Sequence, residues 1–84
     1  MHRIAGDVEL QRLSLAGDGY VYNDFARNGR SGRTYNVLHR ASCQTLLRSN
    51  IGPDKYFAAD LETAVRWLCA NRRDNWKRCE LCTP

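Results

Sequence analysis

The feature that most constrains this chain is a set of four metal-binding side chains in two short motifs. His39 and Cys43 form a His-x-x-x-Cys motif in the middle of the chain, and Cys79 and Cys82 form a Cys-x-x-Cys motif farther along. Three thiolates and one imidazole make up the donor set of a closed tetrahedral zinc site. The pattern predicts one structural Zn²⁺ that ties residues 79–82 to the centre of the chain.

The short length makes such a staple useful. The chain has 84 residues, which indicates a single domain over 1–84, with a lead-in at 1–17 and a core at 18–84. Chains of this size often need a metal or disulfides to be stable. Neither a secretory signal nor a membrane-length apolar run is visible, so we expect no membrane association and a cytoplasmic location. In the cytoplasm thiols stay reduced, and paired cysteines more often bind metal than form disulfides.

Other uses of the cysteines remain open. Cys69 can replace His39 as the fourth ligand, which would give a four-cysteine site. Disulfide formation, redox chemistry or the absence of any metal are further alternatives. Cys69 falls on the apolar stripe of a predicted helix, where a free cysteine behaves as a small hydrophobe. We therefore expect Cys69 in the core and His39 at the metal.

The hydrophobic pattern predicts a small α+β fold. Aromatic and β-branched residues indicate strands at 20–25 and 34–38, joined as an antiparallel hairpin, and a third strand at 55–58. Apolar residues at helical spacing, preceded by the N-cap Asp60, indicate a helix over 60–72. Shorter helices are expected at 7–15, in the lead-in, and at 41–48. The expected architecture is a two- to three-stranded antiparallel sheet with two helices and a C-terminal zinc knuckle.

The charge of the chain points to an anionic partner. Thirteen Lys and Arg stand against nine Asp and Glu, a net charge of +4. Basic residues are densest in the loop 27–33 and in 72–78, with aromatic residues among them, a mixture that suits phosphate contact and base stacking. We therefore predict a nucleic-acid partner, most simply DNA. The predicted contacts are Arg27, Arg30, Arg33, Arg40, Trp76, Lys77 and Arg78.

Two plainer interpretations compete with nucleic-acid binding. The basic face can dock an acidic protein while the zinc is purely structural. Arg66, Arg72 and Arg73 can form a solvated helix face without any partner. An enzyme is not expected, because four protein ligands leave no open position for water on a zinc ion and no carboxylate is placed as a general base.

The motifs also resemble a known family. The segments 39–43, 62–64 and 79–84 follow the layout His-Arg-x-x-Cys, Glu-x-Ala and Cys-x-x-Cys-x-Pro, which is similar to the small zinc domain of the Ada DNA-repair protein and to related modules in nucleases. The resemblance covers about residues 35–84 and implies zinc at His39, Cys43, Cys79 and Cys82 and contact with DNA. The Ada domain uses a cysteine of a four-cysteine site as a methyl acceptor. Here His39 is the first ligand, so methyl transfer is not expected.

The N-terminal strand pair carries a second likeness. The segment 18–23, leading to 37–39, resembles small bacterial modules that occur beside modification-dependent restriction endonucleases. No motif in the chain identifies a particular base that such a module would recognise.

Overall fold

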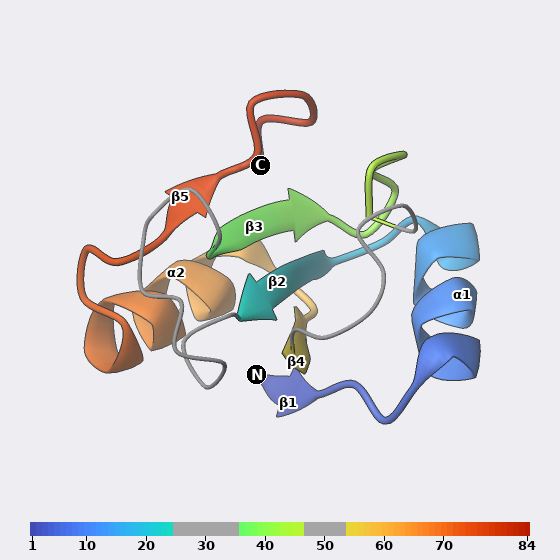
Figure 1. The fold of residues 1–84 in the computed structure, drawn as a ribbon, viewed down its shortest axis with the longest axis horizontal. Helices are drawn as coiled ribbons and strands as arrows, with labels where there is room; N and C mark the ends of the chain where they lie inside the picture. The colour runs from blue at the N-terminus through green and yellow to red at the C-terminus, as the bar shows by residue number, and fades with distance from the viewer. Residues whose placement is uncertain (25–35, 47–53) are drawn as a thin grey trace.

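The described residues of the chain form a small α+β domain with two helices and a five-stranded mixed sheet (Figure 1). The computed structural model describes residues 1–24, 36–46 and 54–84. Its elements in chain order are β1 (His2–Arg3), α1 (Asp7–Ala16), β2 (Tyr20–Asp24), β3 (Val37–Arg40), β4 (Asp54–Ala58), α2 (Leu61–Asn71) and β5 (Lys77–Arg78).

The strands lie in the order β1-β4-β2-β3-β5. The pairs β1–β4, β4–β2 and β2–β3 are antiparallel, and β3–β5 is parallel. The predicted α+β class and the antiparallel pairing of the first two predicted strands are confirmed. The expected sheet of two to three strands was too small, because β1 and β5 add one short strand at each edge. Each has only two residues, too few to show an alternating hydrophobic pattern.

Alternation along β2 and β3 divides the core between the two faces of the sheet. Val21 packs in one apolar cluster together with Ile4, Leu10 and Cys79. Tyr22, the next residue, packs in a second cluster with residues of α2. Val21 is paired with His39 across the β2–β3 ladder, so the imidazole lies on the same face as Val21, opposite the face covered by α2.

Helix α2 follows the sequence prediction closely. The Asp60 side chain accepts a hydrogen bond from the Thr63 N–H at 2.7 Å, which satisfies one of the free donors of the first turn. Ala64 and Leu68 are fully buried against the sheet. The prediction that Cys69 lies in the core was wrong, because its side chain is exposed at the edge of the apolar stripe. Neither α1 nor α2 is long and apolar enough to cross a membrane.

The segment after β3 is a series of turns. A helix was predicted over 41–48, but the described part of this segment, 41–46, has only turn geometry. The Cys43 N–H donates to the Arg40 carbonyl at 2.9 Å, and the Leu46 N–H donates to the Cys43 carbonyl at 3.2 Å. Both bonds span three residues, as in a 3₁₀ turn. The tight turn points Cys43 back toward the end of β3, and Leu46 is buried beneath it.

A buried ion pair ties the end of α2 to the sheet. Arg72 donates from Nη2 to Asp24 Oδ2 at 2.6 Å and from Nε to Asp24 Oδ1 at 3.2 Å. Asp24 is completely buried, and the guanidinium also stacks 5.0 Å above the Trp67 ring. Arg72, expected on a solvated helix face, is thus a structural residue. Removing one partner of such a pair typically costs about 3–5 kcal/mol.

Gly19 occupies a backbone position that has no room for a side chain. Its φ is +88°, and a Cβ there would lie 2.6 Å from the Phe57 ring and 2.9 Å from the Ala58 carbonyl oxygen. We expect Gly19→Ala to lower the free energy of unfolding by about 2 kcal/mol or more, because it adds a clash to a left-handed backbone. Thermal unfolding followed by circular dichroism measures this. The matched control is Gly6→Ala, where no atom lies within 4 Å of the new Cβ; an equal loss in both variants would contradict the prediction.

Candidate metal centre

The four predicted ligands converge on one point. His39 lies on β3, Cys43 lies in the turn that follows, and Cys79 and Cys82 come after β5. One ligand atom from each residue lies within 4.8 Å of each of the others. Cys69 is not in this cluster, which decides between the two ligand sets that the sequence left open. The four residues can hold one metal ion.

Backbone pairing brings the second motif to the first. The Lys77 N–H donates to the Asn36 carbonyl and the Cys79 N–H donates to the Leu38 carbonyl, each at 2.8 Å. These bonds set the parallel register in which Arg78 lies beside Leu38. Cys79, the next residue, therefore arrives beside His39. The β5 strand is short, but it places the Cys-x-x-Cys turn on the edge of the sheet where the imidazole lies.

Arg40 fastens the far end of this turn. Its Nε donates to the Cys82 carbonyl at 2.8 Å and its Nη2 donates to the Thr83 carbonyl at 3.1 Å. The Thr83 N–H in turn donates to the Cys79 carbonyl at 2.9 Å. We call residues 79–84 the knuckle. Its turn is closed within itself and is held to β3 by the Arg40 guanidinium, by the Arg40 N–H on Cys82 Sγ and by the Cys79 N–H on the Leu38 carbonyl.

The spacing of the donor atoms fits a tetrahedral ion. Zn–S bonds of about 2.3 Å at tetrahedral angles place two sulfurs about 3.8 Å apart. The Sγ atoms of Cys43 and Cys79 are 3.9 Å apart, and the longest separation in the set is no more than 4.8 Å. Small side-chain rotations are enough to close the set around an ion. The sulfurs are too far apart for a disulfide, in which they would be about 2.05 Å apart.

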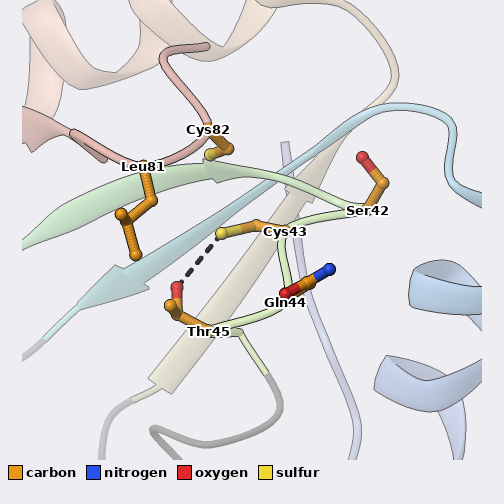
Figure 2. Close-up of a pocket in the computed structure, with 6 residues that line it drawn as sticks. All are labelled: Ser42, Cys43, Gln44, Thr45, Leu81 and Cys82. Atoms are coloured by element: carbon orange, nitrogen blue, oxygen red, sulfur yellow. Dashed lines mark hydrogen bonds between the residues drawn. The ribbon is translucent and has the colours of Figure 1, made fainter.

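Each sulfur faces hydrogen-bond donors. The Arg40 N–H donates to Cys82 Sγ at 3.2 Å, and the backbone N–H groups of Leu81 and Cys82 point at the Cys79 sulfur. The Thr45 hydroxyl lies 3.1 Å from Cys43 Sγ (Figure 2). A thiolate accepts such bonds better than a thiol does, because charge strengthens the acceptor. These donors can therefore bond to thiolates that bind a metal.

The imidazole is oriented for the site by Asn23. Asn23 Nδ2 lies 3.2 Å from His39 Nε2 and donates to it; if the amide is turned by 180°, its oxygen faces the ring and accepts the Nε2–H instead. Nδ1 is buried and has no hydrogen-bond partner among the described residues. A neutral imidazole protonated on Nε2 presents the Nδ1 lone pair to a metal, and a second hydrogen bond of this kind is usual for metal-binding histidines. With the amide turned so that its oxygen faces the ring, Asn23 would select the tautomer whose Nδ1 can bind an ion.

Burial keeps His39 uncharged. Burial, together with the positive charge of Lys55, lowers the pKa of His39 to about 4. At neutral pH the ring is therefore uncharged, and one of its two nitrogens has a free lone pair. The cost of burying a polar nitrogen without a partner is relieved if a cation occupies the centre of the cluster.

The two cysteines of the knuckle differ in proton affinity. Burial acts to raise the pKa of Cys79, but the N–H groups of Cys82 and Leu81 outweigh it and the pKa is lowered. Burial raises the pKa of Cys82 to about 12, and the neighbouring sulfurs of Cys43 and Cys79 add to the rise although the Arg40 N–H opposes it. Three thiolates cannot share this small volume without a compensating cation, which is the electrostatic requirement that a divalent metal meets.

The predicted nucleic-acid contacts are distributed unevenly. Arg27, Arg30 and Arg33 lie outside the described residues. Arg40 holds the knuckle, and Arg78 donates from Nη1 to the Pro84 carbonyl at 2.9 Å.

Three of the predicted contacts come together in one hollow of about 450 Å³, which we call the basic groove. It is lined by Cys69, Arg73, Asp74, Trp76, Lys77 and Arg78.

Two residues at these sites were missed by sequence reasoning. Asn23 was read only as part of a strand, although an amide inside an aromatic and β-branched strand is a signal that a buried polar partner exists. Arg73 belongs to the basic cluster 72–78 but was not among the predicted contacts, because a solvated helix face was an equally open interpretation of it. It adopts φ 55° just beyond α2, a left-handed position that sequence patterns associate with glycine. No sequence signal reveals that this backbone turns Arg73 into the basic groove.

Comparison of the chain with models of protein families, with curated proteins and with solved structures gave no match. The resemblance to the Ada zinc domain therefore stays a prediction. The geometry of the four ligands does not depend on it.

We expect the protein to bind one zinc ion, and native mass spectrometry should detect it. His39→Ala or Cys79→Ser should abolish the zinc adduct, because each removes a donor from the cluster. Cys69→Ser is the matched control, since Cys69 is exposed and outside the cluster. Loss of zinc in Cys69→Ser, or its retention in both ligand variants, would refute the assignment.

Asn23 should control metal affinity without touching the metal. We expect Asn23→Ala to weaken zinc binding about 10- to 100-fold in a chelator competition titration, because second hydrogen bonds to metal ligands typically have effects of this size. Asn36→Ala is the control, because Asn36 is also buried but donates to the Asn75 carbonyl, away from the ligands. Equal zinc affinities in the two variants would show that Asn23 acts only through stability.

Proposed function

We propose that this protein is a non-catalytic, zinc-stabilised module that binds nucleic acid through the basic groove. The observation that carries the proposal is the position of that groove. It is formed by residues 73–78, which lead directly into the first knuckle ligand, Cys79. A metal that fixes the knuckle would also fix this groove.

Zinc is the ion that best suits the donor set. Soft thiolates select zinc, cuprous copper or iron–sulfur clusters, and a three-cysteine, one-histidine tetrahedron is a common structural zinc site. The ligands would supply rigidity rather than chemistry, because four protein donors fill the tetrahedron. Binding free energies of structural zinc reach about 10–16 kcal/mol, similar to the entire stability of a small domain. Loss of zinc would therefore release the knuckle and its neighbours.

The composition of the groove favours nucleic acid over a plain solvated surface. Arg73, Lys77 and Arg78 provide positive charge against the single carboxylate of Asp74. The half-buried ring of Trp76 lies among them and is anchored through its Nε1–H, which donates to the Arg73 carbonyl at 2.9 Å. A fixed aromatic ring beside cations is the arrangement with which proteins stack bases and neutralise phosphates.

The alternative partner is an acidic protein. Both partners would be attracted to the groove in a salt-dependent way. An acidic protein would bind through charge alone and would leave the Trp76 ring without a stacking partner. Nucleic acid uses both features, and we therefore prefer it. The loop arginines at 27, 30 and 33 were predicted as contacts, and we keep them as part of the proposal.

The test is fluorescence anisotropy of the zinc-loaded protein with labelled single-stranded DNA, duplex DNA and RNA at increasing salt. We expect affinity to fall steeply with salt, because binding releases counterions from phosphates. Arg73→Gly should weaken binding and make the slope of log K against log salt shallower by about 0.7–0.9 for each phosphate that is no longer neutralised. Glycine also suits the left-handed backbone at position 73, so a weaker complex could not be attributed to unfolding.

Arg66→Gln is the matched control for charge. Arg66 is highly exposed on α2, where it pairs with Glu62, and its replacement removes the same unit of charge outside the groove. If Arg73→Gly and Arg66→Gln weaken binding equally, the groove is not the site. If polyglutamate binds while none of the three nucleic acids does, the acidic-protein alternative replaces the proposal.

A further inference from the structure

A second hollow lies directly beside the metal ligands. It has a volume of about 430 Å³ and is lined by Ser42, Cys43, Gln44, Thr45, Leu81 and Cys82. We call it the metal-side pocket. Figure 2 shows Cys43 at its centre, with Leu81 and Thr45 on one side and Ser42 and Gln44 on the other. Its volume is within the roughly 300–1,000 Å³ typical of sites for small ligands.

The electrostatics of this pocket differ from those of the basic groove. Its lining contains no Lys or Arg among the described residues, and two of its walls are metal ligands. A zinc ion with three thiolates carries a net charge of −1, since +2 and −3 are summed. A phosphate would be repelled there. A neutral group that presents N–H donors would be attracted, because the sulfurs are acceptors.

The polar and apolar parts of the pocket suit a flat, neutral ring. Gln44 and Ser42 are exposed and offer an amide and a hydroxyl. Leu81 is 76% exposed, and an apolar side chain beside polar groups provides a surface on which a planar ring can lie. Thr45 is already engaged, because its hydroxyl lies 3.1 Å from the Cys43 sulfur. Gln44 is thus left as the most versatile hydrogen-bonding group of the pocket.

We propose that the metal-side pocket receives one unpaired base of the bound nucleic acid and favours a base with an exocyclic amino group. The inference rests on the proposed function. The amide oxygen of Gln44 and the metal-bound sulfurs accept the amino hydrogens, and Leu81 packs against the face of the ring. Glutamine side chains read base edges in this way in protein–nucleic acid complexes.

The two hollows are close enough to act on one strand. Arg78 lines the basic groove and Leu81 lines the metal-side pocket. Three peptide links separate them, so their Cα atoms are at most about 11 Å apart. A strand whose phosphates lie in the groove would need only a few nucleotides to bring a base to the pocket. Because the base must be unpaired, single strands should bind better than duplexes.

The experiment compares oligo(dC) and oligo(dU) of equal length, which differ at the amino or keto group of the base, using anisotropy with the zinc-loaded protein. We expect dC to bind about three- to tenfold more tightly, the effect of one or two net hydrogen bonds. Gln44→Ala should lower the dC/dU ratio, because dC loses one acceptor of its amino hydrogens while the sulfurs remain. Leu81→Ala should weaken both single strands. Leu15→Ala, which removes an equally exposed leucine on α1, should have no effect.

The outcomes separate this inference from the function on which it rests. Salt-dependent binding with a dC/dU ratio of one or less, or with a ratio that survives Gln44→Ala, overturns the base pocket and leaves the basic groove intact. Equal effects of Leu81→Ala and Leu15→Ala also overturn it. Absence of binding to any nucleic acid overturns both proposals. Thermal unfolding of each variant shows that a change in affinity is not a loss of the fold.

Discussion

The parallel pairing of β5 with β3 decides whether the four ligands can meet. Two backbone hydrogen bonds, from Lys77 to Asn36 and from Cys79 to Leu38, set the register of the knuckle against the sheet. A shift by one residue would turn Cys79 to the other face, away from His39 and toward the apolar cluster under α2. The pairing of β5 with β3 involves only two residues of β5, which is too short to fix this register alone. A metal bound by both the knuckle and β3 would fix it.

The interactions around the β5 edge of the sheet differ greatly in free energy. Ranking them by free energy shows which ones hold α2 and the knuckle in place. The exposed contact between Lys77 and Glu80, at 3.8 Å, belongs to a class worth about 0–1 kcal/mol. The buried pair of Arg72 and Asp24 belongs to a class whose disruption costs about 3–5 kcal/mol. Structural zinc contributes about 10–16 kcal/mol. The ion pair therefore holds α2 to the sheet, and a structural zinc ion would add more to the attachment of the knuckle than the hydrogen bonds of Arg40 do.

The parts of the structure that the sequence predicted well have strong local signals. Asp60 followed by an apolar stripe identified α2, and two short cysteine and histidine motifs identified the ligands. The remainder depends on contacts between distant residues. Cys69 lies on the predicted stripe and is nevertheless exposed, because the stripe is wider than the surface that the sheet covers. Asn23 contacts His39 from a neighbouring strand. The two residues are distant in the sequence, so no local sequence pattern could predict this contact.

Placing the ligands at a sheet edge has a consequence for the surface. Residues 76–78 and Leu81 are close in sequence to the ligands Cys79 and Cys82, so their backbone would have little freedom once the ligands are fixed. The anionic metal centre and the cationic groove would then face the same partner from two sides of one short turn. An extended partner that alternates negative and neutral groups matches this pair of surfaces better than a uniformly acidic one. A nucleic-acid strand, with its phosphates and bases, has that alternation, and on the proposed function the metal centre and the groove would form one binding surface.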